Sequence, residues 1–187
     1  MNKNKVAIIV YFLFLAVSSG LALFSFEGYS IVSNTTSHLG AQGSPNALVM
    51  NFVFMCLGAM SIWITLSSKI RFNQVIGMIF GLSLILTGVF RHAPLIDYIE
   101  INKFHDQMHS IFASATGFSF TFLAAGHGFM THKWQRASGL IMAIVATLIP
   151  LGMMALPSYM GLLQRVMFVS AFGWLFFYMK PPNELKK

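Results

Sequence analysis

Six long apolar stretches, each separated from the next by a short polar segment, limit this chain to one kind of fold. Each stretch is long enough to cross a bilayer as an α-helix, which takes about 20 residues. The stretches are residues 6–24, 47–66, 74–90, 108–130, 138–156 and 160–179. We therefore expect an all-α fold, in which residues 1–187 form a single domain: a polytopic membrane bundle of six transmembrane helices.

The composition excludes a soluble domain. Of the 187 residues, 56% are hydrophobic and 9% are charged, whereas soluble domains contain roughly 25% charged residues. The formal net charge of +7 does not indicate nucleic acid binding, because the basic residues stand in short clusters at the ends of the apolar stretches. Such clusters are typical of membrane topology. We expect the lipid bilayer, and not nucleic acid, to be the partner of this chain.

The distribution of lysine and arginine predicts the orientation of the bundle. Nine of the 12 basic residues fall on one side when the six stretches are threaded back and forth. They are Lys3, Lys5, Lys69, Arg71, Lys133, Arg136, Lys180, Lys186 and Lys187. Positive residues remain in the cytoplasm, so both termini are predicted to be cytoplasmic. In the alternative, the first stretch is a cleaved signal peptide with Ser18–Gly20 near its cleavage point. The length of its apolar run favours an uncleaved helix.

Small residues and one histidine predict how the helices pack. Gly77 and Gly81 give the third stretch a bare stripe that another backbone can approach closely, and Ala113 and Gly117 are expected to do the same on the fourth. His127, which stands between two glycines, is expected to be a packing histidine.

The predicted outer face contains an excess of acids and imidazoles. It holds four of the five acidic residues and four of the six histidines. They are Glu27, Asp97, Glu100 and Asp106, and His38, His92, His105 and His109. Orientation requires only that lysine and arginine be scarce there, so this excess predicts a polar extracytoplasmic site. Ser37, beside His38, is a candidate catalytic residue in the polar segment before residue 47; alternatively, that segment's small polar residues satisfy one another's backbone groups.

His105 and His109 form the candidate metal site, together with His38. They are four residues apart, so on a helix both imidazoles project from one face and can bind one zinc ion. His38, His92 and Asp97 are the candidates for a third ligand, and Asp106 is positioned to orient a ligand or bind water. Asp97 and Asp106 are also candidate catalytic residues. The alternative interpretation is an ordinary helix start, with Asp106 near the positive end of the helix dipole.

Arg165 lies about five residues inside the last apolar stretch, which places it about 7–8 Å below the outer boundary. An arginine at this depth is costly unless it reaches the interface or finds a partner. Either its side chain extends to the interface, or one of the four outer acids pairs with it. The functional alternative is that Arg165 binds an anionic head group or stabilises an oxyanion, and it is therefore a candidate catalytic residue.

Short motifs connect these residues to a known family. Tyr29-Ser30, Ser37–Gly40, an outer acidic loop followed by His109, and Gly161–Arg165 resemble the bacterial and archaeal membrane family catalogued as domain of unknown function 998. The resemblance marks Ser37, Leu39, Gly40, His109 and Arg165, with Asp97 as a looser match. It implies six helices in the cytoplasmic membrane of a prokaryote, and it implies no established activity.

The chain departs from the pattern of this family at two places. Phe90–Pro94 replaces a Phe-Pro-x-Asp segment, and Gln164 stands where the family has a glutamate. The second change removes the nearest potential acidic partner of Arg165.

Three functions remain open. The first is a small multi-pass protein whose extracytoplasmic site binds a lipid or amphiphile head group at the outer leaflet. The alternative is a metal-dependent membrane hydrolase that uses His105 and His109, with zinc activating water. The third is a haem-binding membrane protein, with His109 and either His38 or His92 as axial ligands. Whether the protein is an enzyme is left open, and zinc is a possible cofactor.

Overall fold

The structure is a computed structural model, and it describes residues 2–180 of the chain. Over these residues it contains α-helices and short helical segments of other pitch, and no strand. The α-helices are α1 (Lys3–Gly20), α2 (Thr36–Leu39), α3 (Ala47–Leu66), α4 (Arg71–Val89), α5 (Lys103–Met130), α6 (Lys133–Ala155) and α7 (Met160–Gly173). The short segments are η1 (Leu21–Phe24), η2 (Pro157–Tyr159) and η3 (Trp174–Tyr178). The predicted all-α class is confirmed.

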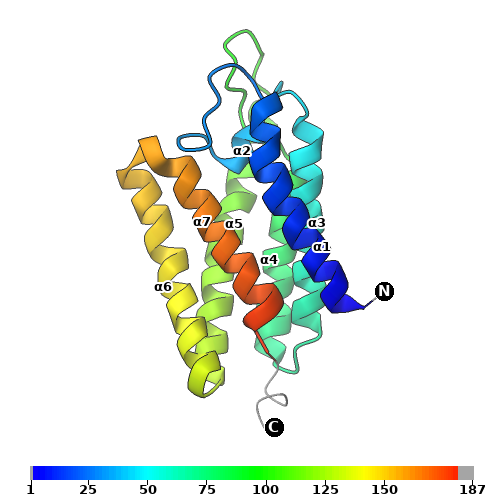
Figure 1. The fold of residues 1–187 in the computed structure, drawn as a ribbon, viewed down its shortest axis with the longest axis vertical. Helices are drawn as coiled ribbons and strands as arrows, with labels where there is room; N and C mark the ends of the chain where they lie inside the picture. Colours follow the sequence, from blue (N-terminus) through cyan, green and yellow to red (C-terminus); the bar gives the residue numbers. More distant parts are fainter. Residues whose placement is uncertain (1, 181–187) are drawn as a thin grey trace.

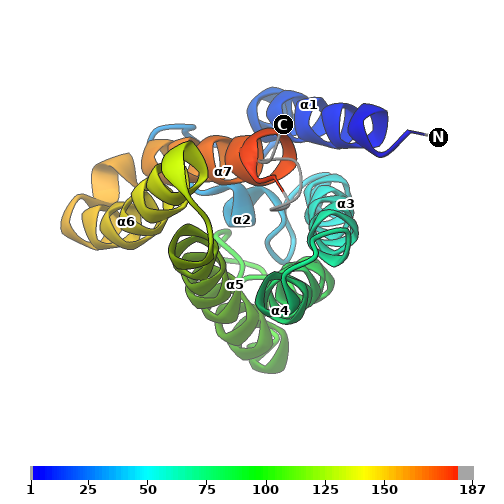
Figure 2. The same cartoon turned by 90° about the horizontal axis from the view of Figure 1, so that it is seen from below.

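Six long helices surround the short α2. From α3 to α7 each long helix packs on the next one along the chain, and α1 packs on both α3 and α7. Figure 1 shows the long helices running along the long axis of the molecule. Figure 2, which views the bundle from below, shows α2 enclosed by the others. The polar segment that contains α2 therefore folds back into the bundle.

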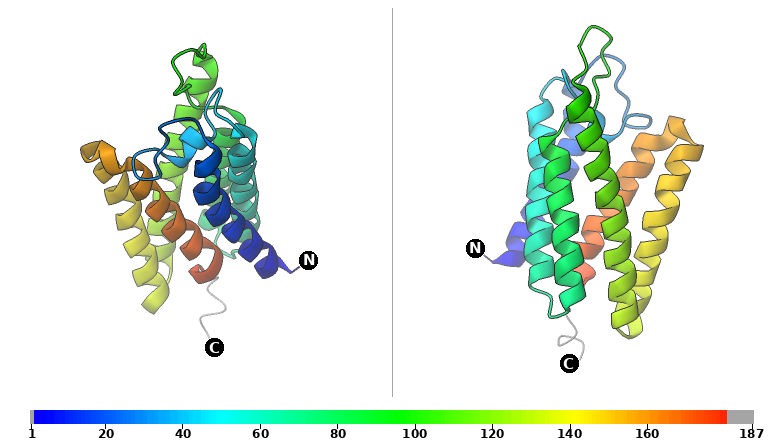
Figure 3. Two further views of the ribbon diagram at one scale, coloured as in Figure 1. Left: turned by 45° about the horizontal axis from the view of Figure 1, so that its top comes forward. Right: turned by 180° about the vertical axis from the view of Figure 1, so that it is seen from behind.

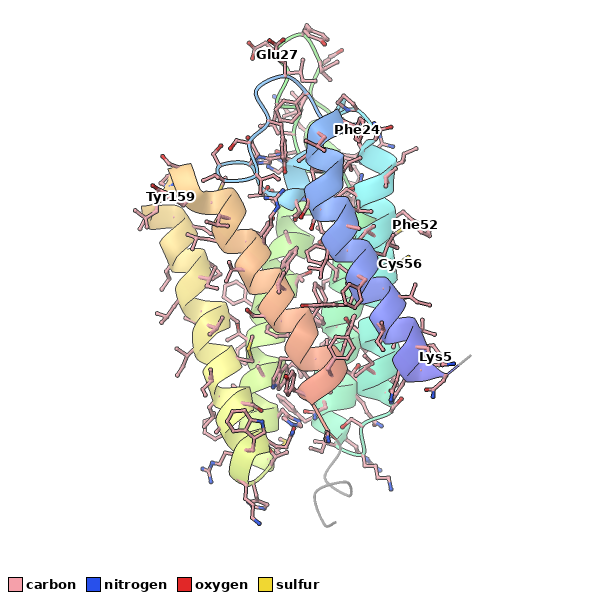
Figure 4. All side chains as sticks on the ribbon, viewed as in Figure 1. Lys5, Phe24, Glu27, Phe52, Cys56 and Tyr159 are labelled. Carbon is pink, nitrogen blue, oxygen red and sulfur yellow. The ribbon has the colours of Figure 1, made fainter. Side chains whose placement is uncertain are left out.

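The two ends of the bundle differ in character. Residues 21–46 and 91–102 cross one end, which we call the loop end (Figures 1 and 3). The start of α1 and the end of η3 both lie at the opposite end, which we call the lysine end. Figure 4 shows Glu27 beyond the loop end and Lys5 at the lysine end. The two ends of the described chain therefore lie on the same side of the bundle.

Five helical stretches are long and apolar enough to cross a membrane, judged by length and composition. They are Lys3–Phe24, Ala47–Leu66, Arg71–Val89, Lys133–Ala155 and Pro157–Tyr178. All five coincide with predicted stretches, and the chain is a multi-pass membrane protein. The remaining predicted stretch, residues 108–130, lies within α5, which has 28 residues but is not among these five. Serine, threonine and histidine side chains along α5 lower its hydropathy.

The predicted glycine stripe on α4 is confirmed. A Cβ atom on Gly81 would lie 2.5 Å from the carbonyl oxygen of Gly58 on α3, so only glycine permits this approach. The matching prediction for Gly117 on α5 is wrong. A Cβ there would have no heavy atom within 4 Å, because Gly117 borders a cavity instead of another backbone.

A buried polar network joins three helices and η3 near the lysine end. His127 is fully buried, as expected for a packing histidine. Its Nδ1 lies 3.0 Å from Asn73 Nδ2, and its Nε2 lies 3.1 Å from Gln135 Oε1. Gln135 in turn donates to the carbonyl oxygen of Tyr178 at 2.8 Å. The network satisfies both ring nitrogens of the buried His127 and fixes η3 against the bundle, while Asn73 Oδ1 is buried without a hydrogen-bond partner among residues 2–180.

Candidate functional site

The polar segment before α3 forms a short buried helix that the sequence analysis did not predict. In α2, Thr36 and Leu39 are fully buried, although four residues form a helix only with outside support. Thr35 and His38 form a capping box: the Thr35 side chain accepts from the backbone N–H of His38, and His38 Nδ1 accepts from the backbone N–H of Thr35. The sequence carries no standard signal for this helix, because a capping box is recognised by glutamate or glutamine three residues after the threonine.

Gln164 on α7 supplies the outside support for α2. Its Oε1 accepts hydrogen bonds from the backbone N–H and the hydroxyl of Thr36, both at 2.7 Å. The first N–H groups of a helix have no partner within the helix, so this contact satisfies one of them in a buried setting. A glutamate could accept the same two hydrogen bonds.

Arg165, the next residue on α7, holds together the segments of polypeptide that meet at the loop end. The guanidinium is buried and donates to four carbonyl oxygens and one hydroxyl. The carbonyl partners are Ser18, Ile31, Asn34 and Gly161, at 2.8–3.3 Å. Within residues 2–180 none of these partners is a carboxylate, so hydrogen bonds to the backbone take the place of an ion pair. Arg165 is thus a positioning residue for the loop end.

Tyr29 provides the hydroxyl partner of Arg165. Arg165 Nη2 lies 2.6 Å from the Tyr29 hydroxyl oxygen, and the hydroxyl donates to the carbonyl oxygen of Thr35 at 3.0 Å. Burial raises the pKa of the Tyr29 hydroxyl, and the neighbouring Arg165 opposes part of that increase. The hydroxyl therefore stays protonated near neutral pH and can donate and accept at once.

Three histidines form a row at the loop end, which we call the imidazole row. The ring centroids of His38 and His92 are 5.1 Å apart, and those of His92 and His109 are 5.5 Å apart. The three rings come from α2, from the connection between α4 and α5, and from α5. The fold thus assembles residues that are far apart in the chain.

The hydrogen bonds of the row fix which ring nitrogens are protonated. His38 Nδ1 accepts from the backbone N–H of Thr35, so the proton of this ring is on Nε2. His109 Nδ1 faces the carbonyl oxygens of Thr87 at 3.1 Å and Phe90 at 2.9 Å, and therefore donates. The Nδ1 of His92 donates in the same way to the carbonyl oxygen of Ala93 at 2.9 Å. The row therefore offers one Nε2–H donor and two Nε2 acceptors.

Burial keeps the first ring of the row uncharged. It lowers the pKa of His38 to about 4, and the charges of His92, His109 and Arg165 lower that pKa further. His38 is therefore neutral at pH 7, with its Nε2–H available as a hydrogen-bond donor.

Asp106 positions the second ring of the row. Its Oδ1 accepts a hydrogen bond of 2.7 Å from the backbone N–H of Ala93, next to His92.

Two other residues of the predicted site, His105 on α5 and Asp97 in the loop, lie outside the imidazole row. His105 packs edgewise on the ring of Phe90, with Nδ1 buried and unpaired, and Asp97 is exposed. In the part of the chain that the structure describes, no group of three or more His, Cys, Asp or Glu side chains is arranged to hold a metal ion.

A cavity of about 110 Å³, which we call the bundle cavity, lies beside α2 among the long helices. Most of its lining is apolar and includes Phe54, Phe80, Phe120, Phe168 and Phe172. The polar lining residues are Ser37, Thr87, Thr116 and Gln164. Ser37 is adjacent to His38, and the carbonyl oxygen of Thr87 accepts from His109, so the cavity adjoins the imidazole row. An apolar engineered cavity of about 150 Å³ holds benzene, so this volume suits a short length of hydrocarbon.

A family model described as "Protein of unknown function (DUF998)" matches residues 8–179. The chain belongs to this family. No curated protein and no solved structure matches it. The motif residues of the DUF998 resemblance all lie at the loop end: three in or beside α2, His109 in the imidazole row, and Arg165 beneath the loop. Gln164, where the resemblance expects glutamate, occupies an acceptor position that either side chain can fill.

Proposed function

We propose that the protein binds an amphiphile at its loop end, with the part of the apolar chain nearest the head group in the bundle cavity and the polar head group against the imidazole row. The observation that supports this is that both are built on the same residues: Thr87 lines the cavity and accepts from His109 through its carbonyl oxygen, and Ser37 lines the cavity and precedes His38 in the chain. An apolar pocket with a few convergent polar groups at one end is the usual form of a small-molecule site.

The chemistry of the row favours an uncharged head group that both donates and accepts hydrogen bonds. His38 offers an Nε2–H, while His92 and His109 offer Nε2 lone pairs. Arg165 already donates to the loop through its guanidinium, so the site does not depend on an anion contact from this residue. A hydroxyl or amide group matches this set.

We further propose that α5 is a sixth span, which gives six transmembrane helices with both termini in the cytoplasm. The two ends of the described chain lie on one side of the bundle, which supports an even number of crossings (Figure 1). The lysines and arginines of that side favour the cytoplasm by the positive-inside rule. The loop end then faces the outer leaflet of a prokaryotic cell membrane.

The metal-dependent hydrolase and the haem-binding protein remain predictions, and no observation on residues 2–180 favours either. Within residues 2–180 no group of three or more His, Cys, Asp or Glu side chains is arranged as the zinc site of the hydrolase would need. The catalytic roles predicted for Ser37, Asp97, Asp106 and Arg165 likewise stay predictions.

The proposal is tested with 1-monolauroylglycerol, whose glycerol head group is uncharged, added to the purified protein in detergent. Binding is measured by native mass spectrometry, with lauric acid at pH 8 as the charged probe and dodecane as the probe without a head group. Gly117→Leu fills the cavity from a position with open space, and Gly20→Leu is the matched control because Gly20 also has no heavy atom within 4 Å of an added Cβ.

We expect monolauroylglycerol to bind more tightly than either other probe, and Gly117→Leu to weaken its binding at least tenfold while Gly20→Leu leaves it unchanged. Equal binding to both variants and to the wild type would show that the cavity is not the site. Tighter binding of dodecane than of monolauroylglycerol would show that the imidazole row does not bind the head group.

A further inference from the structure

A second cavity lies at the lysine end, far from the imidazole row. Its volume is about 510 Å³, and it is lined by residues of α1, of the turn between α3 and α4, and of the segment around η3. Its lining includes Lys3, Lys69 and Lys180, together with the apolar side chains Ala7, Ile8 and Ile64. We call this space the lysine-end cavity.

The charged residues that line this cavity are all lysines. Lys3, Lys69 and Lys180 come from three separate segments, so the fold and not the local sequence brings them to one space. The acidic residues within residues 2–180 lie in the segments that cross the loop end or at the start of α5, on the opposite side of the bundle. Figure 4 shows one of them, Glu27, beyond the loop end. Like charges gathered around one cavity repel, and an anion between them relieves that repulsion.

The apolar part of the lining distinguishes this cavity from a simple cluster of surface charges. Ala7 and Ile64 are buried, while Ile8 and Phe177 are exposed on the sides of the helices that face lipid. A ligand held here contacts charged groups at the end of the bundle and apolar groups along it. This division matches a molecule with an anionic head and hydrocarbon chains.

We propose that the lysine-end cavity binds the phosphate-bearing head group of an anionic phospholipid in the leaflet at that end of the bundle. The phosphate lies among the three lysines, and the acyl chains lie along α1, α3 and η3. Basic pockets between transmembrane helices bind phosphate head groups in this way. The site is separate from the proposed amphiphile site, so either proposal can fail without the other.

The test compares two double variants that remove equal charge from the same end of the bundle. Lys69→Gln/Lys180→Gln alters the cavity, whereas Lys133→Gln/Arg136→Gln alters two exposed residues at the start of α6 that do not line it. The probe is dioleoylphosphatidylglycerol, titrated into purified protein in uncharged detergent and measured by native mass spectrometry. Dioleoylphosphatidylcholine is the lipid without net charge, and inorganic phosphate is the competitor without acyl chains. Circular dichroism verifies that each variant is folded.

We expect the cavity variant to bind phosphatidylglycerol roughly thirtyfold more weakly than the wild type, since each lysine near a membrane surface contributes about a factor of five to six. The control variant is expected to stay within twofold. Equal losses in the two variants would show a diffuse charge effect and overturn the site. Displacement of the lipid by an equal concentration of phosphate would overturn the lipid assignment, as would equal affinity for phosphatidylcholine.

Discussion

Arg165 Nη2 lies 2.6 Å from the hydroxyl oxygen of Tyr29, and this contact joins the last long helix to the loop that follows the first. The same guanidinium bonds to the carbonyl oxygens of Ile31 and Asn34, so it holds both sides of the turn that leads into α2. A charged group inside a membrane bundle is stable only when its donors are satisfied, and here backbone oxygens satisfy them. The position of α2, and with it His38, therefore depends on Arg165.

Replacing Arg165 with lysine is expected to destabilise the protein by about 2–4 kcal/mol. A lysine keeps the charge, but its three donors on one nitrogen cannot reach all the carbonyl groups that surround the edge of the guanidinium. Hydrogen bonds to charged groups contribute about 1.5–3 kcal/mol each and are not additive. The measurement is thermal unfolding in detergent, followed by circular dichroism.

Tyr29→Phe tests the same contact as Arg165→Lys with a smaller expected loss of stability. It removes one of the hydrogen bonds to Arg165 and is expected to cost about 1–2 kcal/mol. Equal stability of Arg165→Lys and the wild type would mean that the guanidinium does not hold the loop.

Gln164→Ala is expected to destabilise α2 by about 1–3 kcal/mol, because the N–H and hydroxyl of the buried Thr36 lose their acceptor. Gln164→Glu keeps an acceptor oxygen in place and is expected to unfold close to the wild-type temperature. Hydrogen exchange at the amide of Thr36 measures the local effect. Similar exchange in Gln164→Ala and Gln164→Glu would show that the acceptor does not hold α2.

The long helices were predictable because a membrane span has a plain apolar signature. Every predicted stretch overlaps a helix, and residues 47–66 coincide with α3. The helix α2 was not predictable in the same way, because its four residues are too few for a periodic pattern. Its stability comes from Gln164, a contact across 128 positions of the chain.

The candidate site was predictable in its location but not in its contacts. His38, His92 and His109 were all expected at one face, and the structure brings their rings into a row. His105 was grouped with His109 by helical spacing, but its ring packs on Phe90. Arg165 was expected to reach the interface or pair with a carboxylate and instead bonds to carbonyl oxygens, which every residue has and which leave no signal in a sequence.

The stability of the protein is expected to fall as the pH decreases from about 6.5 to 4. Burial lowers the pKa of His38 to about 4 in the folded protein, below the ordinary value of 6.5. Between these values the unfolded chain binds a proton at this position and the folded protein does not. Protonation therefore favours unfolding, and the stabilising effect of the neutral ring is fully present only above the unfolded pKa. Chemical unfolding at a series of pH values measures this dependence.

His38→Gln is the control for that dependence, since glutamine retains an acceptor for the backbone N–H of Thr35 and does not titrate. The variant is expected to show a shallower loss of stability between pH 6.5 and 4. An unchanged slope would assign the pH dependence to other groups.

Gly161→Ala is expected to displace the loop that carries α2. An added Cβ would contact the carbonyl oxygen of Asn34 and lie 2.6 Å from that of Ile31, and both oxygens accept from Arg165. Backbone atoms cannot move aside as the tip of a side chain can, so the loop and α7 must separate. Overpacking of this kind costs about 1–3 kcal/mol, whereas alanine gains at most about 1 kcal/mol in helix propensity. The clash therefore exceeds the gain, and net destabilisation follows.

Gly152→Ala on α6 is the control that separates the steric clash from the gain in helix propensity. A Cβ on Gly152 would meet its nearest neighbour, the Leu163 side chain, at 3.7 Å, which is ordinary contact. This variant is expected to unfold at or above the wild-type temperature, while Gly161→Ala unfolds below it and binds monolauroylglycerol more weakly. A Gly161→Ala protein that matched Gly152→Ala in both measurements would show that the loop does not need its close approach to α7, and that the imidazole row keeps its geometry without it.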